Sequence, residues 1–286
     1  MKSIAPVLSV LAAILVIWYG ATVLLNSKWT YDQAARAGES VSISHLLTDT
    51  MSQKRPVLPA PHQVAQGLWD GLFGQRFTSK RSLVFHAWIT LSATMVGFAL
   101  GTGLGILLAV GITHSRAMDL SVMPWAIASQ TVPILAIAPM VIVVLASLGV
   151  TGLLPKALIA AYLNFFPVLV GMVKGLRAPD AMQLDLLKTY NASRSGTLWK
   201  LRLPSSMPYL FASLKVGVAA SLVGTIVAEL PAGATQGLGA RLLSGSYYGQ
   251  TVQIWAALFT AAGLAAILVI AVGVIERVVL RRMGMA

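Results

Sequence analysis

The chain has 286 residues, of which 57% are hydrophobic and only 10% are charged. Because soluble globular domains have roughly a quarter of their residues charged, this composition excludes an ordinary soluble enzyme and predicts an all-α integral membrane protein. The net charge of +12 is explained by the positive-inside bias of membrane proteins without a nucleic-acid partner, and the absence of cysteine and of clustered histidines argues against disulfides, thiol chemistry and a metal site.

Apolar runs that approach the length needed to cross a bilayer occur six times. A helix needs about 20 predominantly apolar residues to span a hydrocarbon core about 30 Å thick. The first run follows a lysine as a signal peptide would, but it is long and no A-x-A site follows it, so we interpret it as an uncleaved first span. The expected spans are Ile4–Leu25, Leu83–Ile112, Leu120–Leu148, Ala157–Val173, Met207–Ala228 and Val252–Ile275.

Residues 26–82 separate the first two spans and are expected to be periplasmic, so that residues 1–82 form an N-terminal span and periplasmic segment. They hold seven lysines and arginines, which disagrees with the charge rule, although a loop of this length lies near the limit of that rule. Apolar residues at helical spacing between Val64 and Phe73 predict a helix. The pattern leaves open whether this helix lies along the outer membrane surface or is buried in the protein.

The second and third spans have compositions that a simple anchor does not need. The second has glycines at four-residue intervals, at Gly97, Gly101 and Gly105, which predicts close packing against a neighbouring helix. The third has three prolines, Pro124, Pro133 and Pro139, which predict a bent backbone.

Several spans carry polar residues that we regard as candidates for lining a translocation path. For Glu229 the sequence leaves two interpretations open, a path-lining group or a residue at the outer rim of the membrane. Lys215 is expected to lie near the cytoplasmic end of its span and to reach the headgroups by snorkelling. The candidate path residues are Ser129, Gln130, Asn164, Ser221, Thr225 and Glu229.

The connector at residues 174–206 determines the expected orientation. It carries six basic residues against two acidic ones and is therefore expected to be cytoplasmic. With six spans, both termini are then cytoplasmic as well.

The same connector has the pattern of a helix, a sharp turn and a second helix. Ala181–Tyr190 is expected to be helical, Asn191 to end it in the left-handed conformation, and Ser193 to cap a second helix that Pro204 closes. The two helices are more apolar than a solvated loop needs to be, which indicates a docking surface. The sequence has no G-x-x-x-x-G-K-[ST] motif, so energy from a nucleotide would have to come from a partner.

This connector resembles the cytoplasmic signature of permease subunits of binding-protein-dependent ABC importers. The family signature is E-A-A, three residues, Gly, nine residues and I-x-L-P. This chain has D-L-L at Asp185–Leu187, three residues, Asn191, nine residues and L-R-L-P at Leu201–Pro204. The spacing matches throughout, and asparagine is a mild replacement for glycine because both tolerate the left-handed conformation.

Further patterns are similar to the nitrate, sulfonate and taurine branch of this family, and the resemblance covers about residues 83–280. They are Y-N-A-S at Tyr190–Ser193, M-P-Y at Met207–Tyr209, A-E at Ala228–Glu229, G-L-G at Gly237–Gly239 and T-V-P at Thr131–Pro133.

The resemblance implies the type I ABC importer permease architecture in a bacterial inner membrane, with residues 83–286 as the permease core. It implies two identical permease chains, two separate ATP-binding ABC subunits beneath them and a periplasmic solute-binding protein above. ATP and magnesium would bind the partner ATPase, and this chain would bind no cofactor. The residues implied to couple to the ATPase are Asp185, Leu186, Leu187, Tyr190, Asn191, Ala192, Ser193, Leu201, Leu203 and Pro204.

The solute class implied by the branch is broad: sulfonates, nitrate, taurine or nitrogen heterocycles. The aromatic and amide groups in the segment Tyr247–Gln253 leave three interpretations open: contact with a heteroaromatic solute, contact with the solute-binding protein, or anchoring at the membrane interface. Among the solutes we favour a nitrogen heterocycle slightly. A secondary transporter and a non-transporting membrane scaffold are the alternatives, whereas a membrane-embedded enzyme would need convergent catalytic groups that the sequence does not bring together.

Overall fold

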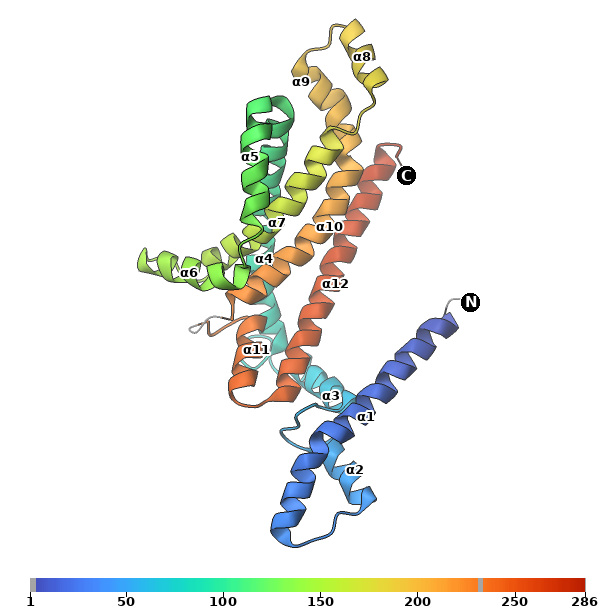
Figure 1. Cartoon of the computed structure of the whole chain (residues 1–286), viewed down its shortest axis with the longest axis vertical. Coiled ribbons are helices and arrows are strands. Elements are labelled where there is room, and N and C mark those ends of the chain that lie inside the picture. Colours follow the sequence, from blue (N-terminus) through green and yellow to red (C-terminus); the bar gives the residue numbers. More distant parts are fainter. Residues whose placement is uncertain (1–3, 231–233, 286) are drawn as a thin grey trace. The chain divides into compact units, whose positions relative to one another are not determined.

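The computed structural model describes residues 4–230 and 234–285, and these residues form helices joined by short connections (Figure 1). Five single helices are long and apolar enough to cross a membrane, and a sixth candidate span is a pair of helices bent by 96°. The all-helical architecture expected from the sequence is thus confirmed, with five or six candidate spans where about six were expected. The chain divides into two compact units, Met1–His86 with Ala240–Ala261, and Ala87–Gly239 with Ala262–Ala286.

Unit 1 contains α1 (Ile4–Ala37), α2 (Ile43–Ser52), α3 (Pro61–Leu72), most of α11 (Leu238–Tyr247) and the first turns of α12 (Thr251–Arg282). The expected first span ends at Leu25, but α1 continues for about three more turns. The polar side chains of this extension explain the difference, because Thr30 donates to Asp49 of α2 at 2.7 Å. The extension is therefore stabilised by packing inside unit 1.

Asn26 organises the segment that follows α2. Its side chain is fully buried, donates to the carbonyls of Thr50 and Leu58, and accepts from the N–H groups of Val57 and Leu58. The helix predicted around Val64 is present as α3, in which Val64 is buried and Trp69 is exposed. The helix therefore buries one face within unit 1 and leaves the other open.

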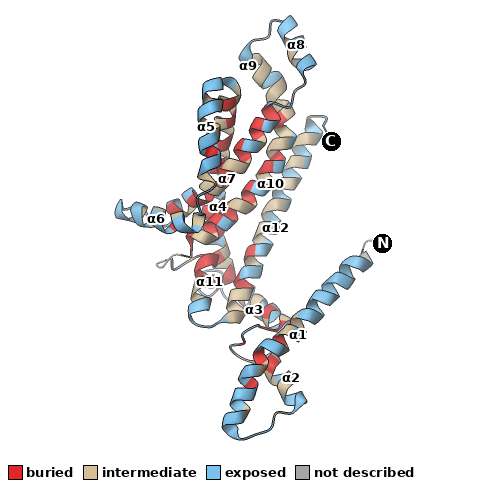
Figure 2. Cartoon of the chain, viewed as in Figure 1, coloured by how far each residue is buried: buried red, intermediate tan, exposed pale blue. Residues whose placement is uncertain are grey.

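Unit 2 contains the remaining helices, and α7 and α10 run side by side through it (Figure 1). Figure 2 shows that their contact is the main buried region, whereas α8 is exposed. The elements are α4 (Leu83–His114), α5 (Arg116–Ser129), α6 (Ile134–Ser147), α7 (Leu153–Leu176), α8 (Ala181–Thr189), α9 (Arg194–Thr197), the π-helical turn η1 (Leu198–Arg202) and α10 (Leu203–Ala228), with the rest of α12.

The expected bend of the third span is confirmed between α5 and α6. The break covers residues 130–133, and Pro133 is the N-cap of α6 in an extended conformation. Proline has no N–H to continue the helix and disfavours the α conformation in the residue before it, so the chain turns at this point.

The glycines of α4 pack against α7, as their spacing predicts. A Cβ added at Gly101 would lie 2.6 Å from the backbone oxygen of Ala161 and 2.9 Å from Nδ2 of Asn164. Gly97 and Gly105 make comparably close approaches to the α7 backbone. Small residues thus bring the two backbones together, which is how helices associate when lipid removes the hydrophobic driving force.

Lys215 differs from its predicted environment. Snorkelling alone was expected, but its Nζ forms an ion pair with the carboxylate of Glu276 on α12. The side chains are 36% and 18% exposed, respectively. The sequence pattern missed this partner because Glu276 follows directly after the apolar run that defines the last expected span.

Candidate functional site

The connector after α7 forms the predicted helix and turn. Asp180 caps α8 and Gln183 closes the capping box by accepting from the N–H of Asp180 at 3.2 Å. Asn191 has φ of 53°, in the left-handed region, and the N–H of Ala192 bonds the carbonyl of Leu187 at 3.0 Å. The left-handed residue therefore reverses the chain as expected from the signature.

Ser193 caps the following helix as predicted, because its Oγ accepts from the N–H of Gly196 at 3.0 Å. The expectation that Pro204 closes this helix is wrong. The helical path continues from Arg194 through η1 into α10, and Pro204 lies in the first turn of α10. A proline inside an α-helix clashes with the carbonyl four residues earlier. Here the N–H of Leu203 bonds the carbonyl of Leu198, five residues back, and this wider turn accommodates the ring.

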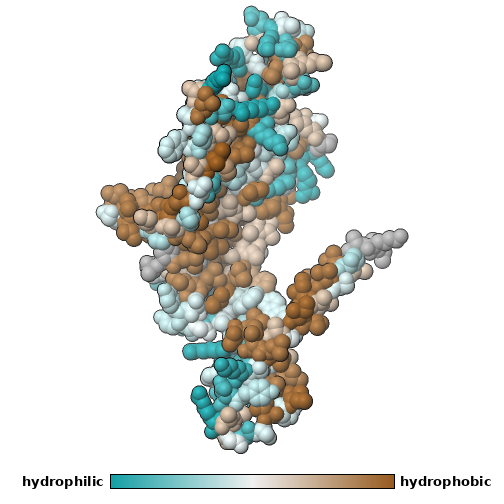
Figure 3. Space-filling model, in the orientation of Figure 1, coloured by the Kyte–Doolittle hydropathy of each residue, from teal (hydrophilic) through white to brown (hydrophobic). Residues whose placement is uncertain are grey.

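An apolar stripe on α8 faces solvent. Met182, Leu186 and Tyr190 are spaced by four residues, which places them on one helix face, and their exposed fractions are 77%, 56% and 77%. Asp185 pairs with Lys188 at 2.8 Å beside this stripe. Figure 3 shows hydrophilic side chains gathered over the end of unit 2 that carries α8 and α9, so apolar groups at this end are exceptions to their surroundings. Exposed apolar groups of this kind are typical of an interaction surface.

The second half of the signature is anchored in unit 2. Leu203 packs against the hydrophobic cluster around Leu169 and Met172 of α7. Arg202 donates from Nη1 to the carbonyl of Leu176 at 3.0 Å, which joins η1 to the end of α7. The predicted coupling residues therefore fall into two groups: residues 185–193 lie on α8 and the turn that follows it, and Leu201, Leu203 and Pro204 are half-buried at the root of α10.

Glu229 stands directly after α10 in a buried polar cluster. Its side chain has no exposed surface. It accepts from Thr90 Oγ1 at 2.9 and 3.1 Å, from Lys156 Nζ at 3.1 Å and from the N–H of Gly239 at 3.0 Å. A buried carboxylate is tolerated when a cation and several donors surround it. The cluster joins α4, α7 and α10 at one end of unit 2.

The A-E and G-L-G patterns meet at this cluster. Gly237 has φ of 119°, and a Cβ there would lie 2.1 Å from the carboxyl of Glu229. A Cβ at Gly239 would lie 2.4 Å from the carbonyl oxygen of Ile226. Glycine at both positions lets the chain pass directly over the carboxylate.

The other polar residues proposed for the path also connect helices. Asn164 donates from Nδ2 to the carbonyl of Phe98 at 2.8 Å and to Thr102 Oγ1 at 3.0 Å. Thr225 accepts from Thr94 at 3.0 Å, and Ser221 lies 3.4 Å from the carbonyl of Ala160. Asn164, Ser221, Thr225 and Glu229 have buried side chains. Contacts between helices engage all of these side chains, although the Asn164 Oδ1 has no hydrogen-bond partner, and a role along the path stays a prediction.

Ser129 and Gln130 lie at the bend between α5 and α6 and are half-exposed. Ser129 Oγ bonds the carbonyl of Ala126 at 2.7 Å and accepts from Gln130 Nε2 at 3.2 Å. The hydroxyl of Tyr162 donates to the carbonyl of Ser129 and links the bend to α7. These two residues are the candidate path groups that reach the surface of unit 2.

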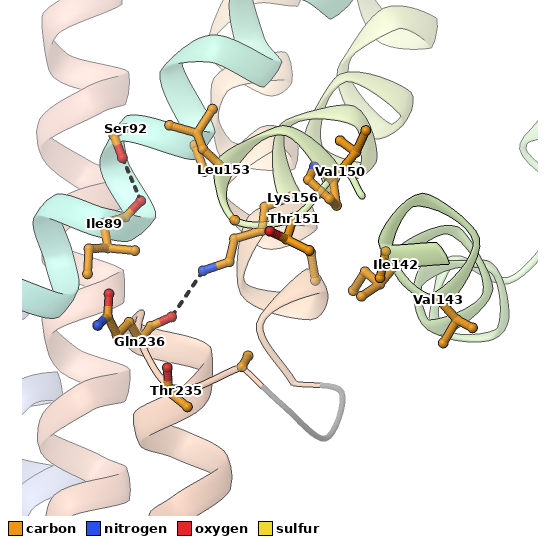
Figure 4. Close-up of a pocket in the computed structure, with 16 residues that line it drawn as sticks. Ile89, Ser92, Ile142, Val143, Val150, Thr151, Leu153, Lys156, Thr235 and Gln236 are labelled. Carbon is orange, nitrogen blue, oxygen red and sulfur yellow. Dashed lines mark hydrogen bonds between the residues drawn. The ribbon is translucent and has the colours of Figure 1, made fainter. Parts of the chain in front are cut away.

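A pocket of about 690 Å³ lies next to the Glu229 cluster in unit 2. Figure 4 shows Ile142 and Val143 of α6 on one side and Ile89 and Ser92 of α4 on the other. Lys156 points toward the carbonyl of Gln236, to which it donates at 3.0 Å. The lining is mainly apolar with a few hydroxyl and amide groups, which is the composition of sites for small organic molecules.

The sequence did not single out Lys156 or Thr90. Lys156 stands immediately before the expected fourth span, and a basic residue at a span end usually has no specific partner. The available signal was the acid of the A-E pattern, because a carboxylate near hydrocarbon requires a cation nearby.

Comparisons with known proteins point to one family. The model of the binding-protein-dependent transport system inner membrane component matches residues 101–285. The chain is similar to a riboflavin transport system permease of Chloroflexus aurantiacus, with 31% identity over 79% of this chain and 80% of the relative. A probable ABC transporter permease of Haemophilus influenzae is 30% identical over 71% of this chain and 77% of the relative.

A formylaminopyrimidine transport permease of Halalkalibacterium halodurans is 29% identical over 64% of this chain and 68% of the relative. The matched family region contains the bent α5–α6 pair, α8 with its left-handed turn, and α10. These similarities favour an ABC importer permease over the secondary-transporter and scaffold alternatives. The chain belongs to the family of inner-membrane components of binding-protein-dependent transport systems and is a multi-pass permease subunit of an ABC importer.

Proposed function

We propose that α8 is the element through which a separate ATP-hydrolysing subunit drives this permease. The observation that carries the proposal is the exposed stripe of Met182, Leu186 and Tyr190 on a helix that is followed by a fixed left-handed turn. A groove on the ATPase that accepts this stripe would bury apolar surface now in contact with water, which favours docking.

The connections of α8 to the spans support a mechanical role. Arg202 bonds the end of α7, and α7 and α10 pack through Gly171, Gly175 and Gly217, where added Cβ atoms would lie less than 3 Å from neighbouring atoms. A closely packed pair of helices moves as a rigid body. A displacement of α8 by the ATPase would therefore tilt α7 and α10 together.

Replacement of Leu186 by aspartate tests the docking surface. In the complex with its ATPase, L186D places a charge in an apolar contact, and we expect solute-dependent transport to fall at least tenfold while the chain still inserts in the membrane. A178D adds the same charge at an exposed position before α8 and should transport at nearly the parental rate. Parental transport and parental ATPase binding by L186D would refute the docking role of α8.

We propose that the complete importer contains two copies of this chain, two ATP-binding subunits that hold ATP and magnesium, and a periplasmic solute-binding protein. The basic connector at residues 174–206 supports a cytoplasmic position for α8 and for both termini. Native mass analysis of the complex, extracted in mild detergent, should give two permease and two ATPase chains. One permease chain paired with a different permease would refute the homodimer and leave the coupling proposal standing.

We propose a small nitrogen heterocycle as the solute. The relatives described as riboflavin and formylaminopyrimidine permeases are 31% and 29% identical to this chain, whereas those described as aliphatic sulfonates and nitrate permeases are 27% and 23% identical. This order of similarity supports a heterocycle. The apolar pocket beside Lys156 and Gln236 has a lining suited to a flat ring with a few polar atoms. Uptake of labelled riboflavin and aminopyrimidines by cells with and without the gene tests the class. A defect confined to a sulfonate or nitrate would refute it.

A further inference from the structure

A second pocket, of about 660 Å³, lies within unit 1. Its wall includes residues of the segment after α2, of α3, of the connection ahead of α4, of α11 and of the first turn of α12. Gly67 lets α3 approach α12 closely, because a Cβ there would lie 2.8 Å from Cγ1 of Val252. The pocket is thus bounded by packed elements of a single unit.

The charge of this pocket is strongly positive. Lys54, Arg55, Arg81 and Arg241 line it, and Asp70 is the one acidic side chain among the described lining residues. Across residues 4–230 and 234–285, the ion pairs of the chain involve other residues, so none of these four cations is neutralised by a carboxylate within 4 Å. Cations gathered in a concave site repel one another unless an anion joins them.

Arg241 is held in place by a neutral partner. With the amide of Gln253 oriented so that its oxygen faces the guanidinium, this oxygen accepts from three nitrogens of Arg241 at 3.1 to 3.2 Å, and the amide nitrogen donates to Gln250 Oε1 at 2.6 Å. Burial, and then the charge of Arg81, lower the pKa of Arg241 from its ordinary value. The guanidinium of Arg241 is therefore held by a neutral amide and is not part of any ion pair found among the described residues.

The start of α12 adds to this field. Val252 and Gln253, in the first turn of a 32-residue helix, line the pocket. The N–H of Gln253 bonds the carbonyl of Gln250 at 3.0 Å, so the helix start adds the partial positive charge of its dipole. Three arginines, one lysine and a helix start thus line one recess.

We propose that this pocket binds an oxyanion, namely a phosphate, sulfonate or carboxylate group of a small molecule or a lipid headgroup. Arg81 and Arg241 supply charge-assisted hydrogen bonds, and Gln250 is a neutral polar residue in the same lining. A recess of this volume admits a small anionic group, whereas a macromolecular partner would need a broad open face.

Residues 26–82, which supply Lys54, Arg55 and Arg81 to the pocket, are expected from the sequence to be periplasmic. We therefore infer that the pocket is on the outer side of the membrane. The outward position of the pocket rests on the orientation proposed above, but its affinity for an oxyanion does not.

The chain has no native cysteine, so a single introduced cysteine can report on the pocket. We would label Q75C with an environment-sensitive maleimide dye in the purified complex with its ATPase, and titrate inorganic phosphate against chloride at constant ionic strength. We expect a saturable phosphate response whose apparent Kd rises about tenfold or more in R81Q and in R241Q, because each removes a charge-assisted bond. R76Q, at an exposed position nearby that does not line the pocket, should change the Kd less than twofold.

A comparison of two lipid compositions distinguishes a lipid headgroup from a soluble anion as the ligand. A signal already saturated in nanodiscs containing phosphatidylglycerol, and absent in phosphatidylcholine alone, identifies a lipid headgroup. A signal that requires added phosphate in both lipids identifies a soluble anion. R241K keeps the charge and should retain binding if R241Q loses it for electrostatic reasons rather than by misfolding.

No difference between phosphate and chloride together with no difference between the two lipids, or an unchanged Kd in both R81Q and R241Q, would overturn the oxyanion site. Labelling of Q75C in intact cells by a membrane-impermeant maleimide tests the orientation separately. Failure of that labelling would overturn the outward position while the titration still decides the chemistry.

Discussion

Removal of Lys156 tests whether the Glu229 cluster holds unit 2 together. In Lys156→Met, a side chain of similar length replaces the ammonium, and the carboxylate of Glu229 keeps only the hydroxyl of Thr90 and the N–H of Gly239. The Glu229 side chain has no exposed surface and the Lys156 side chain is only 14% exposed. Water therefore cannot replace the ammonium, and the substitution leaves the buried carboxylate without a cation.

Breaking a buried ion pair by removing one partner costs about 3–5 kcal/mol. The two remaining donors to Glu229 place the expected loss at the low end, about 3 kcal/mol. For a chain of this size, such a loss corresponds to a fall of about 6–12 °C in apparent Tm. Glu229→Gln should cost less, because the amide still accepts from Thr90 and the Lys156 ammonium keeps the Gln236 carbonyl at 3.0 Å.

The assay is thermal unfolding of the importer complex in one detergent, followed by loss of the monodisperse peak. K200M removes an exposed lysine and serves as the control, with an expected shift below about 1 °C. The double variant E229Q/K156M should be more stable than the sum of the single losses predicts, because neither charge is then left alone. A parental Tm for K156M, or strict additivity in the double variant, would refute the proposed role of the pair.

Two further changes test the turn after α8 and the contact between α4 and α7. Asn191→Val should cut transport per ATP hydrolysed several-fold, because a β-branched residue disfavours the φ of 53°, whereas N191G should keep it; equal coupling ratios in the two variants would contradict this. Gly101→Val should lower the yield of monodisperse complex strongly, since its Cβ would lie 2.6 Å from the Ala161 oxygen. Gly103→Val has open space around the Cβ and should extract normally, and similar yields for both valine variants would argue against close packing at Gly101.

The spans and the coupling turn were predictable from the sequence because their determinants are local. An apolar run of about 20 residues has few alternatives to a membrane-spanning helix. Asn191 and Ser193 act within a few residues of their own position, through a backbone conformation and a cap, so the pattern was enough to assign both. Pro133, between α5 and α6, likewise acts on adjacent peptide groups.

The contacts that join distant helices were not predictable in the same way. Glu229 and Lys156 are 73 positions apart in the chain, and no local pattern pairs them. Lys215 and Glu276 meet only because α10 and α12 are neighbours. The prediction that the helix ends at Pro204 was wrong, because a π-helical turn, which is rare, accommodates the proline ring.

The signature of this permease combines an exposed half with an anchored half, and the physics of the membrane explains why both are needed. Between helices in lipid, apolar burial gives little driving force, so close glycine contacts and buried hydrogen bonds hold α4, α7 and α10 together. Helices joined by such contacts are difficult to separate, because separation would leave polar groups unpaired in hydrocarbon. A force applied to α8 is therefore expected to move these helices as one body. Conformational change within unit 2 is then expected at its less closely packed places, namely the α5–α6 bend and the pocket beside α6.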